Sequence, residues 1–247
     1  MALITNIVSY YKFDGNVTTD AVGSNDLTNN GADYDATAKI NGGYDFVAAN
    51  TDYMKVSSPS FLSNTAGTVN IWVKCDNLVN GQILWGSGDE GGGADFLYIV
   101  IRKDDNETYN DNTLNIISYH NGFDYSIYTP QDSLPTSGYH MFTFVSDGSA
   151  IKIYVDGVNQ TLTTNLGTNN GNWFGDNAAL DNFTIGTLEY NSGTFSGWLT
   201  AGIDEVGVWS VALSQALVTE LYNSGDGLQY PFTAVAADNT LFMGMNF

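Results

Sequence analysis

The chain has 247 residues, 43% of them hydrophobic and only 14% charged, so it can bury a substantial core and is not a disordered polypeptide. Seven basic residues stand against 27 acidic ones, and the net charge of −20 disfavours nucleic acid, anionic membrane surfaces and acidic polysaccharides as partners. A neutral glycan, a cation or a basic protein fits this charge. The single cysteine, Cys75, excludes an intrachain disulfide, and no apolar run is long enough to insert into a membrane.

The opening part of the chain contains a loop rich in Asp, Asn and Gly, "FDGNVTTDAVGSND". Calcium takes six to eight oxygen ligands from carboxylates, amides and carbonyls, which this composition supplies. The loop is not an EF-hand, because it lacks flanking helices and the final glutamate. Asp14, Asn16 and Asp20 are therefore candidate calcium ligands. The alternative is that these side chains only cap turns through hydrogen bonds to the backbone.

Short alternating runs separated by turn residues fill the middle of the chain and predict antiparallel strands. Examples are "TVNIWVKC", "FLYIVIRK", "TLNIISYH" and "AIKIYVDGV". Asp147-Gly148 separates two such runs and predicts a hairpin, and Asp156-Gly157 predicts a second turn. Strands at this spacing, with almost no helix, favour an all-β sandwich.

The loop at 163–182 offers the clearest candidate for sugar contact. Within "NNGNWFGDN", Trp173 lies among polar residues, and Asn172 and Asp176 are placed to orient sugar hydroxyls. The alternative is a loop held to the body of the protein by its own aromatic residues. The other tryptophans considered, Trp72, Trp85 and Trp209, fall inside predicted strands and are interpreted as core.

One helix is expected near the C-terminus, at about residues 214–223. Ser214 is a suitable N-cap and Gly225 a suitable stop signal. Beyond it, residues 231–247 change character and end in an apolar cluster. We expect this tail to dock on a partner chain through five side chains: Leu241, Phe242, Met243, Met245 and Phe247.

Three stretches together resemble laminin-G-like, concanavalin A-like lectin and glucanase domains. They are "YYKFDGNVTTDAVGSNDLTNNGADY" with "GGYDFVAANTDYMKV", "SGYHMFTFVSDGSAIKIYVDGV", and "GIDEVGVWSVALSQALVTELYNSG". The likeness spans roughly residues 6–230 and implies an antiparallel jelly-roll β-sandwich with one short C-terminal helix. We therefore expect a sandwich domain over 1–230 and a docking tail over 231–247. Such domains bind glycans or proteins, often with calcium, and some are glucanases.

Asp204 and Glu205 in "GIDEVGVW" are the most conspicuous carboxylates of the chain. A strand directs adjacent side chains to opposite faces, so a catalytic pair is not expected here. The glucanases of the resembled family carry Glu-x-Asp-x-x-Glu, which this sequence lacks. The resemblance also places the first strand beside the last. Asp204 would then join Asp14, Asn16 and Asp20 in a structural Ca²⁺ site.

These observations predict a non-catalytic surface module that binds a neutral glycan or host-surface polysaccharide. The opening residues lack the basic and apolar segments of an export signal, which favours a virion protein: a capsid fibre, a decoration or a tail protein. We expect a homo-oligomer or part of a larger assembly of structural chains at the virion surface. The alternatives are a secreted bacterial lectin module and, less favoured, a glycan-cleaving enzyme.

Overall fold

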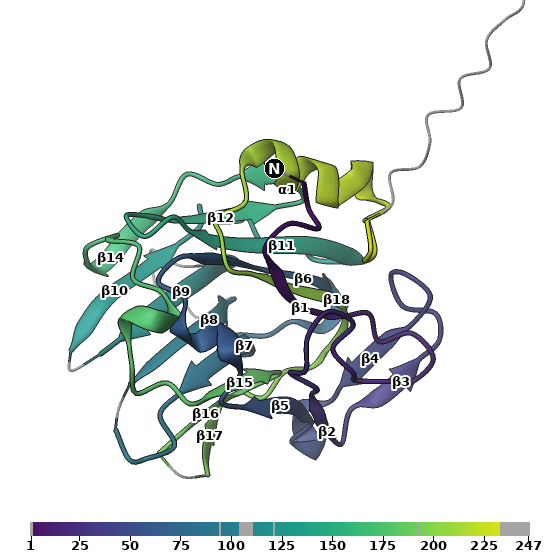
Figure 1. Ribbon diagram of the computed structural model, residues 1–247, viewed down its shortest axis with the longest axis horizontal. Helices are drawn as coiled ribbons and strands as arrows, with labels where there is room; N and C mark the ends of the chain where they lie inside the picture. The colour runs from purple at the N-terminus through teal and green to yellow at the C-terminus, as the bar shows by residue number, and fades with distance from the viewer. Residues whose placement is uncertain (1, 94, 104–110, 121, 192, 233–247) are drawn as a thin grey trace, which may run out of the picture.

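Two antiparallel β-sheets pack face to face in the computed structural model, which describes residues 2–93, 95–103, 111–120, 122–191 and 193–232 (Figure 1). The first sheet runs in the order β13-β12-β11-β6-β18-β4-β3, with β1 paired to β18. Its strands are β1 (Ile7–Tyr11), β3 (Asp33–Asp35), β4 (Gly43–Phe46), β6 (Gly67–Lys74), β11 (Tyr139–Ser146), β12 (Ile151–Val155), β13 (Val158–Asn159) and β18 (Ala201–Trp209).

The second sheet runs in the order β14-β10-β9-β8-β7-β15-β5-β2. Its strands are β2 (Thr28–Asn30), β5 (Tyr53–Ser57), β7 (Ile83–Gly88), β8 (Phe96–Arg102), β9 (Thr113–Tyr119), β10 (Phe123–Tyr128), β14 (Thr163–Gly167) and β15 (Asn182–Ile185). A separate hairpin consists of β16 (Leu188–Tyr190) and β17 (Thr194–Ser196). Five single 3-10 turns occupy Ala48–Asn50, Ser60–Ser63, Cys75–Asn77, Phe174–Asp176 and Asn223–Gly225.

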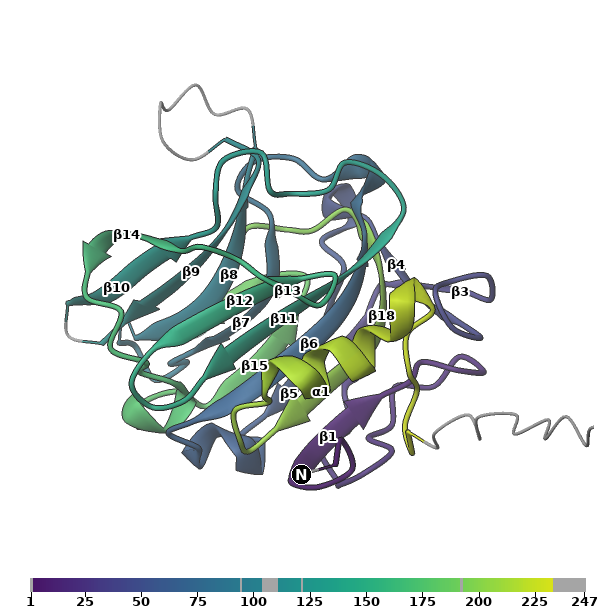
Figure 2. The same cartoon turned by 90° about the horizontal axis from the view of Figure 1, so that it is seen from above.

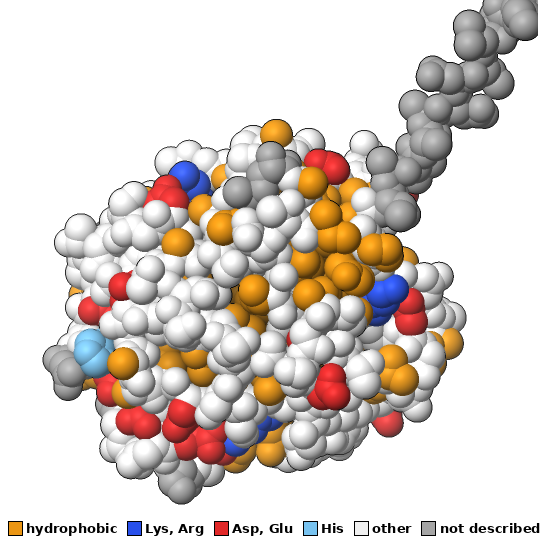
Figure 3. All heavy atoms as spheres, viewed as in Figure 1, with side chains coloured by type: hydrophobic (Ala, Val, Ile, Leu, Met, Phe, Trp, Pro, Cys, Tyr) orange, Lys and Arg blue, Asp and Glu red, His pale blue; other side chains and the backbone are white. Residues whose placement is uncertain are grey.

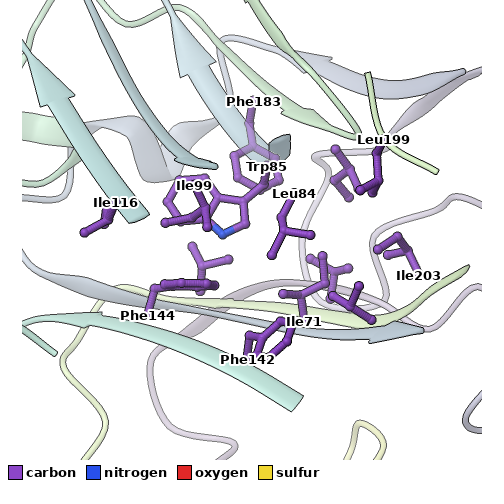
Figure 4. Packing of buried hydrophobic residues seen from close by; sticks show 14 of the residues in the cluster. Ile71, Leu84, Trp85, Ile99, Ile116, Phe142, Phe144, Phe183, Leu199 and Ile203 are labelled. Carbon is purple, nitrogen blue, oxygen red and sulfur yellow. The ribbon is translucent and has the colours of Figure 1, made fainter. Parts of the chain in front are cut away.

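The main hydrophobic core lies between the sheets, where the inward side chains of both meet. Trp85 of the second sheet packs against Phe144 of the first and against Phe183, with ring centroids 5.7 and 5.8 Å away (Figure 4). The period-2 pattern read from the sequence puts these residues inside, since alternate residues of a strand share a face. The predicted all-β sandwich is confirmed.

The first sheet is covered on its outer face as well. Helix α1 (Gln215–Tyr222) lies across it (Figure 2) and buries Leu217, Val218 and Leu221 in a second cluster with Trp72 and Trp209. Hydrophobic side chains gather at the surface beside the end of the described chain (Figure 3). Partly buried residues that pack against this cluster include Ile7, Val22, Ala212 and Phe232. The five predicted docking residues of the tail lie outside the described residues.

Both predicted turns form hairpins. Asp147 follows β11, and its Oδ1 accepts hydrogen bonds from the amides of Ser149 and Ala150, which closes the turn into β12. Asp156 and Gly157 form a two-residue turn between β12 and β13, both with positive φ (51° and 76°). This is the backbone that Asp-Gly favours in tight hairpins.

The helix begins and ends close to its predicted limits. Ser214 Oγ accepts a hydrogen bond from the amide of Leu217 at 3.4 Å, as an N-cap should. The stop is Asn223, at φ 49°, and not Gly225 as predicted, because asparagine also tolerates the left-handed conformation that ends a helix. Across the residues described, no helix has both the length and the apolarity to cross a membrane.

Replacing Ser214 by alanine tests the packing of α1 on the first sheet. Losing the N-cap should cost about 1 kcal/mol of unfolding free energy and lower Tm by about 2–4 °C for a chain of this size. Calorimetry on Ser214→Ala measures the shift, with the exposed Ser57→Ala as the matched control. Equal Tm values for the two variants would contradict a stabilising cap.

Candidate functional site

A β-bulge in β18 places Asp204 and Glu205 on the same face of the first sheet. The register with β6 shifts between Asp204 and Gly207, and Glu205 has a positive φ of 48°. Asp204 therefore faces outward beside Trp72, and Glu205 faces outward toward Tyr10. The opposite-face prediction is wrong, because a bulge inserts one residue and breaks the alternation of a regular strand.

Both carboxyl groups are fully buried and hydrogen-bonded. Asp204 accepts from the amide of Ile40 at 2.7 Å and from the amide of Glu205 at 2.8 Å. Glu205 contacts Tyr10 Oη and Gln229 Nε2, each at 2.5 Å. Gln229 belongs to the segment after α1, so Glu205 ties that segment to the first strand.

Burial makes both groups unusually weak acids. It raises the pKa of Asp204 to about 8, although two backbone amides oppose the shift. Burial and the neighbouring Asp204 charge raise the pKa of Glu205 to about 9. Tyr10 Oη donates to Glu205 Oε2 and also lies 3.1 Å from the carbonyl oxygen of Leu228. The pair is a closed structural network with no access to a substrate.

Glu205→Gln should make stability less dependent on pH. The folded state keeps a proton that the unfolded chain releases above about pH 4, so wild-type stability falls as pH rises from about 4 to 9, by up to about 1.4 kcal/mol per pH unit and group. Glutamine has no proton to lose. Denaturant unfolding from pH 5 to 9 should therefore show a shallower decline for the variant than for wild type.

The exposed Glu220→Gln, on α1, is the matched control and should retain the wild-type slope. If the unfolding free energy of wild type and of Glu205→Gln falls equally steeply with pH, Glu205 is ionised in the folded state.

The four predicted calcium ligands do not form one site. Asp20 accepts from three backbone amides, those of Tyr10, Val22 and Asn25. Asp14 accepts from the side chain of Gln229, Asn16 accepts from the hydroxyl of Tyr44, and Asp204 is engaged as described above.

Within the described part of the chain, no three His, Cys, Asp or Glu side chains gather in a way that suits a metal ion. The four residues therefore do not form the predicted metal site. Their side-chain oxygens accept hydrogen bonds from backbone amides and from neighbouring side chains. Calcium binding by the protein stays a prediction.

Trp173 is a core residue, and the sugar contact predicted for it is wrong. Only 2% of it is exposed, and its ring packs against Phe174 and Trp85 at 5.0 and 6.1 Å. Asp176 accepts a hydrogen bond from the Trp173 amide at 2.8 Å, and the Asn172 carbonyl accepts one from the buried Tyr125. The polar neighbours thus pin the loop to the core.

Trp173→Ala should destabilise the fold by about 3–5 kcal/mol, the usual cost of removing a core tryptophan. Trp198→Ala is the natural comparison, because Trp198 is the only tryptophan of the five that is not buried and should cost less. Chemical denaturation of both variants measures the difference. A Trp173→Ala protein as stable as Trp198→Ala would place Trp173 at the surface.

A row of aromatic rings occupies the outer face of the second sheet. In β8, Leu97, Ile99 and Ile101 point into the core, so Phe96 and Tyr98 point outward. The row is made of contacting rings that are half-buried or exposed, and we call it the aromatic face: Phe96, Tyr98, Tyr119, Phe123 and Tyr190.

The rings of the aromatic face lie close enough to form one surface. Phe96 stacks on Tyr119 with centroids 5.2 Å apart and an interplanar angle of 28°, and Tyr119 meets Phe123 at 5.0 Å. Phe123 is 55% exposed, and the other four rings are half-buried. Because the rings contact one another, the aromatic face is a candidate binding surface.

Polar groups flank the aromatic face. Arg102, the only arginine of the chain, follows Tyr98 at an even spacing on β8 and therefore shares its face. Asn115 of β9 pairs with Val100 and with Tyr128, but it is only 2% exposed and its Oδ1 accepts from the buried Ser126 Oγ. The donor that lies beside the flat apolar rings within reach of solvent is therefore the guanidinium of Arg102.

Sequence reasoning missed the aromatic face. The alternation of "FLYIVIR" places Phe96 and Tyr98 on one side and three aliphatic residues on the other, which was a usable signal. Tyr128 faces the same side, whereas Tyr125 is fully buried. The pairing of β8 with β9 and of β9 with β10, which brings Tyr119 and Phe123 alongside, cannot be deduced from a single strand.

The family model described as the concanavalin A-like lectin/glucanases superfamily matches residues 48–219, so the chain belongs to this family. It is a lectin-like domain by fold. No curated protein matches the chain.

Solved structures show the same fold at low identity. Domain 4 of the arabinanase AbnA from Geobacillus stearothermophilus, seen with arabinotriose, is 19% identical, with a TM-score of 0.59 over 87% of this chain and 97% of that domain. The Ruminococcus gnavus sialidase CBM40 bound to α2,3-sialyllactose is 16% identical, with a TM-score of 0.53 over 71% of this chain and 91% of that one.

A botulinum neurotoxin type C structure, whose cell entry depends on two ganglioside molecules, is 11% identical, with a TM-score of 0.65 over 90% of this chain. The match covers 52% of the neurotoxin chain, so this protein corresponds to about half of it. At such identities the likeness establishes the fold alone.

Proposed function

We propose that this protein is a non-catalytic glycan-binding module that holds a neutral glycan on the aromatic face. The observation that carries the proposal is the run of contacting rings from Phe96 to Phe123 on a sheet face that also carries Arg102. Aromatic rings present a large, rigid apolar surface at small entropic cost, which suits the apolar faces of sugar rings.

Two further observations support the proposal, the first for a glycan and the second for its neutrality. Structural neighbours were seen with arabinotriose, which is neutral, and with sialyllactose, or depend on gangliosides, which like sialyllactose carry acidic sialic acid. The net charge of −20 repels polyanions at long range and leaves uncharged polymers unaffected.

The state of the acid pair supports binding without cleavage. Asp204 and Glu205 are fully buried, and both lie on the outer face of the first sheet, away from the aromatic face. The chain also lacks the Glu-x-Asp-x-x-Glu pattern of the related glucanases. Placement on a virion surface, an oligomeric state and, alternatively, secretion stay predictions from the sequence.

Phe123→Ala should weaken glycan binding by at least about tenfold, since burying a phenylalanine ring contributes about 1.5–3 kcal/mol. The assay is an array of immobilised neutral polysaccharides (arabinan, xylan, mannan, galactan and β-glucan), with chromatography of the supernatant to detect released sugars. We expect binding by wild type and no released product.

Val158→Ala is the matched control, because Val158 is 62% exposed and lies in β13 of the first sheet. It should bind as wild type does. Wild type that retains none of the polysaccharides, or a Phe123→Ala variant that binds equally well, would refute the proposal, and released oligosaccharides would refute its non-catalytic part.

A further inference from the structure

A second cluster of surface aromatics lies on the other side of the β16–β17 hairpin. Tyr53 of β5 contacts Phe195 and Trp198, with ring centroids 5.0 and 5.9 Å apart, and Phe195 stacks on Trp198 at 5.2 Å with an angle of 24°. All three are half-buried. The other four tryptophans are at most 2% exposed, so leaving this one at the surface calls for a reason.

The backbone holds this cluster rigidly. On one side of Trp198, the carbonyl of Gly197 accepts a hydrogen bond from the amide of Ile83 at 2.7 Å, and a Cβ on Gly197 would lie 2.6 Å from the Ile83 side chain. On the other side, the Leu199 amide bonds Gly186 O at 2.9 Å, and Leu199 is fully buried. The backbone on both sides of Trp198 is therefore held by hydrogen bonds, which preorganises the position of the indole.

Both clusters share the outer face of the second sheet. Met54 and Val56 enter the core, so Tyr53 and Lys55 point outward. Lys55 forms ion pairs with Glu189 of β16 at 2.7 Å and with Glu90 at 2.8 Å, which holds the hairpin against this face (Figure 1).

The hairpin stands between the two clusters and contributes a ring to each. Tyr190 on β16 belongs to the aromatic face, and Phe195 on β17, which pairs with Glu189 and so points to the opposite face of the hairpin, belongs to the second cluster. Strand β5 is three positions from β8 in the sheet order, so the strands that carry Tyr53 and Phe96 lie about 14–15 Å apart at the usual strand spacing. One extended polymer can cross that span, whereas a single sugar cannot.

We propose that Tyr53, Phe195 and Trp198 form a second contact surface for the same neutral polysaccharide, so that the protein binds the interior of a long chain at two points. This inference rests on the proposed glycan-binding function. When one polymer binds at the first surface, its binding at the second surface becomes an intramolecular step. Affinity therefore rises steeply once the glycan is long enough to reach both surfaces.

Affinity against glycan length tests the inference. Wild type, Trp198→Ala and Phe123→Ala are titrated by calorimetry with arabinan, xylan, mannan, galactan and β-glucan and with a short oligomer of each. Two-point binding predicts that wild type binds the polymer at least about a hundredfold more tightly than its short oligomer. Either variant should lose most of that difference.

Trp198→Phe keeps a ring at the position and should restore much of the length dependence, and the Tm of each variant shows that it is folded. Trp198→Ala binding the polymer as tightly as wild type, or wild type binding oligomer and polymer equally, would overturn the second surface and leave the first intact. Wild type that binds no member of the panel would overturn the proposed function itself.

Discussion

Burial of β18 on both of its faces is the constraint on which the rest of the structure depends. This strand pairs with β1, β4 and β6, and all nine of its residues are buried. Its inner face belongs to the core between the sheets, while its outer face needs a cover. Helix α1 and the segment after it provide that cover, so the C-terminal part of the described chain completes the first sheet.

The bulge at Glu205 shows what such double burial demands of polar groups. Two carboxyl groups in a dry environment persist only if they are neutral or fully hydrogen-bonded, since an unpaired buried charge is very costly. Asp204 accepts hydrogen bonds from two backbone amides, and Glu205 accepts hydrogen bonds from the side chains of Tyr10 and Gln229. The Glu205 contacts connect strand β1 to the segment after α1, so the role of the acid pair in the fold is structural.

Covering the first sheet leaves the second sheet with the free face. Among the described residues its outer side carries the β16–β17 hairpin, and the aromatic side chains on either side of that hairpin remain within reach of solvent. The proposed glycan surface lies on this face. One sheet holds the molecule together, and the other presents rigid rings from Phe96 to Trp198 across a broad surface.

The sequence by itself determined the sandwich, the α1 helix, both Asp-Gly hairpins and the core role of Trp72, Trp85 and Trp209, because these follow from local periodicity and turn chemistry. Only the tertiary structure decided the face of Glu205, the burial of Trp173 and the exposure of Trp198. The physical reason is that exposure and face depend on which elements pack over a residue. A bulge, a loop packed on the core or a helix that covers a sheet depends on contacts between segments far apart in the chain. The local pattern of residues does not predict such contacts.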